Sequence, residues 1–380
     1  MYCRWYYGDI SRTEAEKLLY GEGNQRGSFL IRQSETVPGG HSLSLRDRDK
    51  VKHYKIKCER DAFFIAPHIR FKSIADLITH YQGHLDGICV CLLYPCVSVE
   101  KPQTAGLSKH TNDDWEIEQK QIRLVKKLGS GSFAQVWGGI WNGTTSVAVK
   151  TLKTGSGMAE SDFLREATLM KELRHPNILQ LYAMCTKEQP LYIVTELMKH
   201  GCLLDYLRNE RGSLKLSQLI SMAQQVTEGM SYLEEHQYIH RDLAARNVLV
   251  GDGLVCKISD FGLTQSVKEA ESKAHKGTKF AIKWAAPEAL IHNNFSVKSD
   301  VWSFGILLYE IITYGRFPYA GMTNEEVIRK LEHGYRMPQP KESSYTYYNI
   351  MLKCWREEPE NRPTFKALQW ELEEFLESTR

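Results

Sequence analysis

At 380 residues the chain is longer than one ordinary domain, so its length predicts two domains. A hydrophobic content of 42%, a charged content of 25% and a formal net charge of +3 are typical of a soluble globular protein and give no sign of a nucleic-acid partner. No apolar run approaches the roughly 20 residues of a membrane-spanning helix, and the first residues lack a signal-peptide core and a myristoylation glycine. We expect a cytoplasmic chain with no membrane anchor and no nucleic-acid partner.

The nine cysteines are scattered from Cys3 to Cys354 without the paired spacing of a zinc site. Such an arrangement indicates free thiols in a reducing compartment. Cys89 and Cys91 are the closest pair, and their spacing fits alternate positions on one strand better than a metal site.

The first hundred residues have the pattern of a small α+β unit. Short alternating runs predict strands at 28–32, 41–46 and 53–57, with turn residues between them. Ser11 and Ser73 each precede an acidic residue by three positions, which is typical of a helix N-terminus, so we expect one helix after each serine.

After residue 96 the chain becomes polar and loses its periodicity, which predicts a linker over 97–121. From 122 to about 200, strand signals surround one helical run, ESDFLREATLMKEL. From Leu214 onward the apolar residues recur with helical spacing. A strand-rich lobe followed by a helix-rich lobe predicts two lobes with a cleft between them.

The run LGSGSFAQV at 128–136 is a glycine-rich turn. Alone it is weak evidence, because dinucleotide-binding folds and plain hairpins also contain such runs. Here strand residues follow and end in VAVK, which makes Lys150 a candidate phosphate-binding lysine. A strand lysine is usually a solvated charge, but Glu166, in the middle of the next predicted helix, supplies a carboxylate that would hold Lys150 against the phosphates of a nucleotide.

The strongest chemical signal is IHRDLAARNVLV at 239–250, followed by KISDFG at 257–262. Phosphoryl transfer needs a carboxylate that orients the attacking hydroxyl, and oxygen ligands for Mg²⁺. Asp242 fits the first role, and Asn247 and Asp260 fit the second. Ordinary turn residues are the alternative interpretation, but it does not predict their joint spacing.

Glu288 of the APE run completes the series of motifs, and Arg362 is its expected partner. With these motifs in this order, residues 122–376 resemble a protein kinase domain. HRDLAARN at 240–247 and FAIKWAAPE at 280–288 resemble the tyrosine-kinase pattern. The resemblance implies a bilobal domain with a β-rich N-lobe and an α-helical C-lobe. It also implies an ATP-dependent transferase acting on protein tyrosine substrates, with Mg²⁺ as its ion and Mn²⁺ as the alternative.

The resemblance also implies three sets of site residues. The catalytic set is Asp242, Lys150, Glu166 and Arg246. The metal ligands are Asn247 and Asp260. In the nucleotide-binding set, Glu196 and Met198 contact adenine through the backbone, Thr195 lies at the back of the pocket, and Val136, Ala148 and Leu249 enclose the ring. The full set is Leu128, Gly129, Gly131, Val136, Ala148, Lys150, Thr195, Glu196, Met198 and Leu249.

Residues 5–96 resemble a Src-homology-2 (SH2) domain in the runs WYYGDISRTEAEKLL, GSFLIRQSET and VKHYKI. The resemblance implies a central antiparallel sheet flanked by two helices, and binding to phosphotyrosine-containing proteins. A doubly charged phosphate needs forked, permanently charged donors, so Arg32 on its strand is the expected bidentate partner. Tyr54 is expected to border the groove for the residues after the phosphotyrosine. For His53 alone, an ordinary packed histidine is the competing interpretation. The accessory phosphotyrosine-binding positions are Arg12, Ser34, Thr36, His53 and Lys55.

The segment 260–288 has both kinase end motifs but contains no tyrosine. KPQTAGLSK and DDWEI resemble the linker of the Src family and of its breast-tumour-kinase and Srm-like relatives. In those kinases a phosphotyrosine in the segment between DFG and APE pairs with the HRD arginine and with a second arginine just after DFG. This chain keeps Arg241 but has Ser272 and Gln265 at the other two positions, and Csk is similar in having DFGLT and no tyrosine. We therefore expect a segment that does not need tyrosine phosphorylation.

Two other functions compete with tyrosine kinase activity. A catalytically silent phosphotyrosine-binding adaptor with a pseudokinase scaffold is one, but such scaffolds usually lose part of the role set that this chain keeps in full. Dual specificity towards serine is the other, and Lys283 and Trp284, before the APE run, oppose it. We expect an active signalling kinase.

Overall fold

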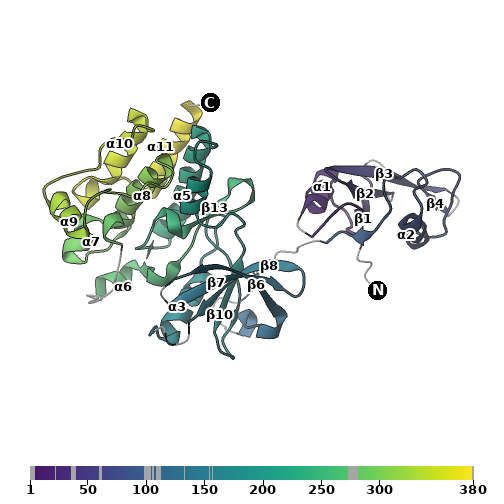
Figure 1. The fold of residues 1–380 in the computed structure, drawn as a ribbon, viewed down its shortest axis with the longest axis horizontal. Coiled ribbons are helices and arrows are strands. Elements are labelled where there is room, and N and C mark those ends of the chain that lie inside the picture. Colours follow the sequence, from purple (N-terminus) through teal and green to yellow (C-terminus); the bar gives the residue numbers. More distant parts are fainter. Residues whose placement is uncertain are drawn as a thin grey trace. The chain divides into compact units, whose positions relative to one another are not determined.

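The structure is a computed structural model, and it describes residues 5–21, 23–35, 40–59, 62–97, 104, 107, 113–131, 133–153, 155, 157–272 and 281–378. Thr36 lies outside these residues, as do much of the predicted linker and part of the segment before APE. The chain divides into two compact units, residues 1–102 and 103–380. Each is drawn in Figure 1 and described by itself below.

The first unit is a five-stranded sheet with two helices. Its strand order is β4-β3-β2-β1-β5, and all neighbours are antiparallel except β1 and β5. The strands are β1 (Ser28–Gln33), β2 (His41–Asp47), β3 (Lys50–Glu59), β4 (Ala62–Phe64) and β5 (Tyr94–Pro95), and the helices are α1 (Arg12–Tyr20) and α2 (Ile74–Gly83).

The expected local signals of the first unit are present. Ser11 Oγ accepts a hydrogen bond from the Glu14 backbone N–H at 3.1 Å, and Ser73 Oγ accepts from Asp76 N–H at 3.1 Å, so both serines cap their helices. All three predicted strands are confirmed. The strand expected at Cys89 and Cys91 is wrong: the chain there is an irregular loop, held by the hydrogen bond that Cys89 N–H donates to the Tyr54 hydroxyl at 3.0 Å.

The second unit begins with a five-stranded antiparallel sheet in the order β6-β7-β8-β10-β9. The run after the glycine-rich turn is two strands and not one, because Asn142 and Gly143 both adopt positive φ and reverse the chain. The elements of this N-lobe are β6 (Ile122–Ser130), β7 (Ala134–Trp141), β8 (Thr145–Leu152), α3 (Glu160–Glu172), β9 (Leu181–Cys185) and β10 (Tyr192–Glu196).

The rest of the second unit is mostly helical, as the periodicity predicts, and Figure 1 shows α5, α8, α10 and α11 gathered in this C-lobe. Its helices are α4 (Leu203–Asn209), α5 (Leu216–Glu235), α6 (Val267–Ser272), α7 (Pro287–His292), α8 (Val297–Ile312), α9 (Asn324–Glu332), α10 (Tyr345–Cys354) and α11 (Phe365–Ser378). Its short strands are β11 (Tyr238–Ile239), β12 (Val248–Val250), β13 (Cys256–Ile258) and β14 (Gln265–Ser266).

Helix α8 is the central element of the C-lobe. Every residue from Ser299 to Ile312 is buried, which is typical of a helix enclosed on all sides by other elements. Two carboxylates, Asp300 and Glu310, lie within this apolar helix, and buried charges need hydrogen-bonding partners. Their partners are backbone and indole N–H groups of the loops described below.

The end of the predicted linker packs on the N-lobe. Trp115 is fully buried, and Ile117 N–H donates to the Met184 carbonyl at 2.9 Å. Glu116 accepts hydrogen bonds from the backbone N–H and the hydroxyl of Thr186, both at 2.8 Å. Residues 115–117 are therefore part of the second unit and not a free tether.

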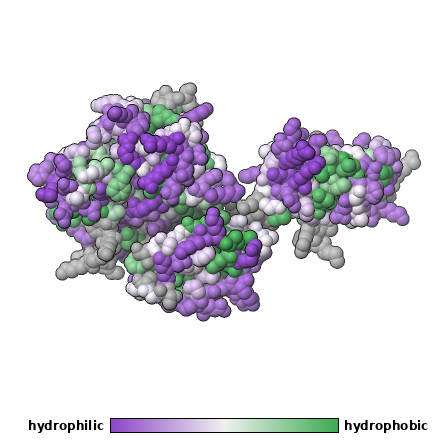
Figure 2. Space-filling view, viewed as in Figure 1, coloured by the Kyte–Doolittle hydropathy of each residue, from purple (hydrophilic) through white to green (hydrophobic). Residues whose placement is uncertain are grey.

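The faces drawn in Figure 2 are largely hydrophilic, with smaller apolar patches. No helix in the described ranges combines the length and apolar content that crossing a bilayer requires. The eight cysteines that the structure describes are free thiols. Within the same residues, no cluster of three or more His, Cys, Asp or Glu side chains has the geometry of a metal site.

Candidate active site and phosphate pocket

Lys150, on β8, lies between two carboxylates. Its Nζ is 2.8 and 2.6 Å from the two Glu166 carboxylate oxygens and 3.2 Å from Asp260 Oδ1. Burial alone would lower the pKa of Lys150, but the two carboxylates raise it above its ordinary value. The ammonium group in turn holds the pKa of Asp260 below its usual range. The two carboxylates thus favour the charged form of Lys150, although burial raises the pKa of Glu166 itself.

Secondary structure explains this meeting of residues from distant parts of the sequence. Lys150 is in the middle of the sheet, paired with Val136 of β7 and Ile193 of β10. Glu166 shares the buried face of α3 with Phe163 and Met170, because residues three and four apart lie on one side of a helix. Packing of that face against the lobe brings the Glu166 carboxylate to Lys150.

The catalytic-loop candidates form a second cluster. Asn247 Nδ2 donates to the backbone carbonyl and to the carboxylate Oδ2 of Asp242, each at 2.7 Å. The Arg246 guanidinium pairs with the other oxygen of Asp242. Asp242 is therefore fixed by both neighbours, while Asn247 keeps its amide oxygen as a ligand group. Asp260 follows in a left-handed backbone conformation, with φ 63° and ψ 70°.

Helix α8 holds the loop just before Asp242. The Asp300 carboxylate accepts the backbone N–H groups of His240 at 2.7 Å and Arg241 at 2.9 Å. Burial raises the pKa of Asp300 to about 6. Arg241 needs this support because its φ is 69°, a conformation that non-glycine residues rarely adopt.

Most residues of the predicted nucleotide-binding set lie on strands of the second unit. Ala148 and Thr195 are direct cross-strand partners on β8 and β10. Gly129 has no heavy atom within 4 Å of where a Cβ would lie, so the glycine-rich turn leaves open space for a ligand. Leu128 is on β6, Gly131 begins the turn into β7, Val136 is on β7, Met198 follows β10 and Leu249 is on β12.

The Glu196 side chain has a structural partner of its own. It pairs with Lys257 at 2.7 Å and accepts the Gln180 backbone N–H at 2.8 Å. Only its backbone groups are therefore suited to contact a nucleotide, and that is the role expected from the sequence.

The segment after DFG is partly described. Gln265 is buried in β14, which pairs with β11. Glu269 of α6 lies 3.5 Å from the Arg165 guanidinium of α3. The Arg241 guanidinium packs 4.2 Å from the centre of the Phe295 ring, and burial lowers its pKa. The Arg241 side chain thus has the Phe295 ring as a packing partner. The Ser272 side chain lies outside the described part of the structure.

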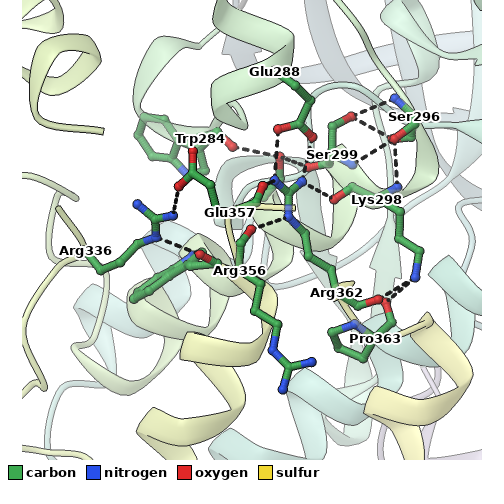
Figure 3. Close-up of polar contacts among 12 residues, drawn as sticks. Trp284, Glu288, Ser296, Lys298, Ser299, Arg336, Arg356, Glu357, Arg362 and Pro363 are labelled. Carbon is green, nitrogen blue, oxygen red and sulfur yellow. Dashed lines mark hydrogen bonds and ion pairs between the residues drawn. The ribbon is translucent and has the colours of Figure 1, made fainter. Parts of the chain in front are cut away.

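The expected partner of the APE run is present. Figure 3 shows Arg362 directed at Glu288, with the two nitrogen–oxygen pairs at 2.6 and 2.9 Å. The guanidinium is 2% exposed and also donates to the carbonyls of Lys298, Arg356 and Glu357. This bidentate, fully hydrogen-bonded pair ties the end of the segment to the C-lobe core.

In the first unit, Arg32 points from β1 into the interior and is 4% exposed. Its contacts are long: 3.4 Å to Ser44 Oγ, 3.3 Å to the Gln33 carbonyl and 3.5 Å to Glu35. Charge-assisted hydrogen bonds are usually 2.7–2.9 Å. A buried guanidinium whose contacts with the described residues are all long is suited to exchange them for a stronger acceptor.

Glu16 connects two of the expected accessory residues. Its carboxylate lies 2.9 Å from His53 Nε2 and 3.1 Å from Arg12 Nε. The other ring nitrogen of His53 is 2.9 Å from Ser44 Oγ, and burial lowers the His53 pKa. His53 is thus hydrogen-bonded through both ring nitrogens. Glu16 was not expected from the sequence. A signal for Glu16 was available, since it lies one helical turn after Arg12.

The remaining accessory positions lie around the same strands. Ser34 follows β1, and its N–H donates to the Gly40 carbonyl at 2.9 Å. Lys55 is exposed on β3, opposite Ser42 of β2. These positions are near the Arg32 strand, and Thr36 lies outside the described residues.

Together, the bilobal second unit with its lysine–carboxylate cluster and the sheet of the first unit with its buried arginine define a protein kinase joined to a phosphate-recognition domain. A family model described as protein tyrosine and serine/threonine kinase matches residues 122–372, and the SH2 domain model matches residues 5–81. The chain is 53% identical over 380 residues to tyrosine-protein kinase FRK of Homo sapiens, covering 98% of this chain and 75% of that protein. It is 55% identical over 350 residues to tyrosine-protein kinase SRK2 of Spongilla lacustris, covering 92% of this chain and 96% of that protein.

The chain therefore belongs to the protein-tyrosine kinase family, as a non-receptor kinase with an SH2 domain that is related to the Src family. The predicted tyrosine kinase function and the SH2-plus-kinase fold are confirmed at this level. Kinases of this family use ATP and Mg²⁺.

Proposed function

We propose that Asp242 orients the substrate tyrosine hydroxyl and accepts its proton, while Arg246 and Asn247 hold that carboxylate in position. The hydrogen bonds of Asn247 at 2.7 Å and the Arg246 ion pair support these roles, because they leave Asp242 one orientation. A carboxylate fixed in advance needs no reorganisation when the hydroxyl arrives.

Lys150 holds the phosphates of ATP, and Glu166 holds Lys150. The Lys150 ammonium group, on β8 of the sheet, compensates negative charge on the triphosphate. The nucleotide-binding set from Leu128 to Leu249 encloses the adenine, with backbone groups of Glu196 and Met198 as its polar contacts.

The donor set of the loops fits a hard divalent ion. Asn247 offers an amide oxygen and Asp260 a half-exposed carboxylate, and Mg²⁺ in such sites takes one or two protein oxygens together with phosphate oxygens and water. When bound, Mg²⁺ supplies charge neutralisation on the phosphate oxygens, and Mn²⁺ is the alternative ion.

In the first unit, Arg32 binds the phosphate of phosphotyrosine-containing proteins, with Arg12, Ser34, Thr36, His53 and Lys55 around it. Its buried guanidinium with long contacts is the supporting observation. The functional domains run over 5–96 and 122–376, with 97–121 between them, and the protein acts in the cytoplasm.

The single observation that carries the proposal is the Lys150–Glu166–Asp260 cluster, which joins β8, α3 and the DFG motif at 2.6–3.2 Å. Lys150→Met removes the ammonium group and leaves two carboxylates facing each other. We expect it to lower phosphate transfer to a tyrosine peptide by several powers of ten while the purified chain keeps its circular dichroism spectrum. Wild-type turnover in a folded Lys150→Met chain would reject the assignment.

A further inference from the structure

Glu310, on the buried helix α8, connects two functional loops through one oxygen atom. Its Oε2 accepts the Ala245 backbone N–H at 2.9 Å and the Trp284 indole N–H at 2.9 Å. Ala245 lies in the catalytic loop, three residues after Asp242. Trp284 lies in the FAIKWAAPE run, just before APE. The resemblance of this run to tyrosine kinases implies that it forms the platform on which the substrate tyrosine lies.

Trp284 reaches Asp242 by a second route. The Arg246 guanidinium, which pairs with Asp242, lies 4.8 Å from the centre of the Trp284 ring. A ring below a guanidinium attracts it and limits its motion. Trp284 thus contacts both the support of the catalytic loop and the arginine that holds its carboxylate.

The Glu310 carboxylate is 2% exposed, and burial raises its pKa. A buried carboxylate is costly unless its hydrogen bonds are made, so its two N–H partners are held firmly. Asp300, ten residues earlier on α8, holds the backbone before Asp242 in the same way. Helix α8 therefore fixes the catalytic loop on both sides of Asp242. It also holds Trp284, through Glu310 at the indole N–H and through Ser303, whose Oγ donates to the Trp284 carbonyl at 2.8 Å.

We propose that Glu310 is a positioning residue for tyrosine substrates, which sets the distance between the substrate platform at Trp284 and the catalytic loop that carries Asp242. The inference rests on the proposed role of Asp242. A substrate phenol bound on the platform must present its hydroxyl to Asp242, and this alignment is lost when the shared oxygen is removed.

Three variants separate this role from simple stabilisation. Glu310→Gln retains an amide oxygen that can accept both N–H groups, so it should keep kcat and the peptide KM within about threefold of wild type. Glu310→Ala removes both bonds and should lower kcat/KM for a tyrosine peptide about 100-fold, the usual effect of a misplacement near 1 Å. Its KM for ATP should stay within about twofold, because the nucleotide residues lie on other elements. Trp284→Phe removes the indole N–H, keeps an aromatic ring beside Arg246 and should raise the peptide KM.

Glu234→Ala is the matched control. Glu234, on α5 of the same lobe, also accepts a backbone N–H at 2.9 Å, from Phe365 at the start of α11 and not from a residue of the catalytic loop. This variant should lower the melting temperature without changing either KM. The double variant Glu310→Ala/Trp284→Phe should be no slower than Glu310→Ala, because both changes break the same contact.

Several results would overturn the inference. They are a normal peptide KM in Trp284→Phe, additive losses in the double variant, or equal effects of Glu310→Ala and Glu234→Ala on kcat/KM. If Glu310→Ala does not fold, Trp284→Phe and Glu310→Gln still decide the matter, since both keep the acceptor at position 310. An inactive Asp242→Asn together with a normal Trp284→Phe would reject this inference and leave the proposed role of Asp242 intact.

Discussion

Arg32→Leu gives a direct test of the phosphotyrosine pocket. The wild-type guanidinium is buried and its present contacts, at 3.3–3.5 Å, are too long to be strong. Binding a phosphate replaces them with two charge-assisted hydrogen bonds, each contributing about 1.5–3 kcal/mol. The variant should therefore lose at least about 3 kcal/mol of binding free energy, which is a rise in Kd of about 150-fold or more.

The assay is titration calorimetry of the full chain with a tyrosine-phosphorylated peptide and with its unphosphorylated form. Arg32→Lys keeps the charge but not the fork, so its affinity should fall between those of wild type and Arg32→Leu. Arg46→Leu is the matched control, because Arg46 donates to the carbonyls of Leu19 and Asn24 within the same unit and serves the fold. Unchanged affinity in a folded Arg32→Leu chain would mean that the phosphate binds elsewhere.

Two further predictions concern the kinase unit. Burial raises the pKa of Asp300 from 3.8 to about 6. Between these two pH values the native state therefore binds more protons than the unfolded state. As pH rises through this window, the contribution of Asp300 to the free energy of unfolding falls. In urea unfolding, Asp300→Asn should therefore cost about 1.4 kcal/mol more at pH 5 than at pH 7.5, and equal costs would contradict the shift. Because the segment between Asp260 and Glu288 has no tyrosine and Arg241 already packs on Phe295, phosphatase-treated enzyme, ATP-preincubated enzyme and Ser272→Ala should have equal turnover. A large activation that maps to a phosphorylated residue in this segment would refute that expectation.

Much of the fold follows from local sequence signals. The alternating run at 41–46 becomes β2, and the serine caps at Ser11 and Ser73 start α1 and α2, because these signals depend on neighbouring residues alone. The loop at Cys89 was predicted wrongly as a strand, since its conformation depends on a hydrogen bond that Cys89 N–H donates to the Tyr54 hydroxyl of β3. Tertiary contacts of this kind are invisible to local pattern.

The candidate site also contains residues that the sequence marks and residues that only the folded chain reveals. Lys150, Asp242, Asn247 and Asp260 stand out because phosphoryl transfer requires those groups and because their motifs occur in the order of the kinase family that the sequence resembles. Asp300 and Glu310 act through residues that they meet only in the folded chain, so no motif marks them. Glu16 meets His53 in the same way, although its spacing from Arg12 was a local signal. Glu310 had one available signal: a carboxylate inside an otherwise apolar helix is costly unless it has partners.

The measurement that tests the account most directly is the turnover of Asp242→Asn with Mg²⁺-ATP and a tyrosine peptide, read by mass spectrometry. The substitution keeps the shape of the side chain and its contacts with Asn247 but removes the charge that accepts the tyrosine proton. We expect phosphate transfer to fall by several powers of ten while ATP affinity and the melting temperature stay near those of wild type. Near-normal turnover in a folded Asp242→Asn chain would contradict the central claim.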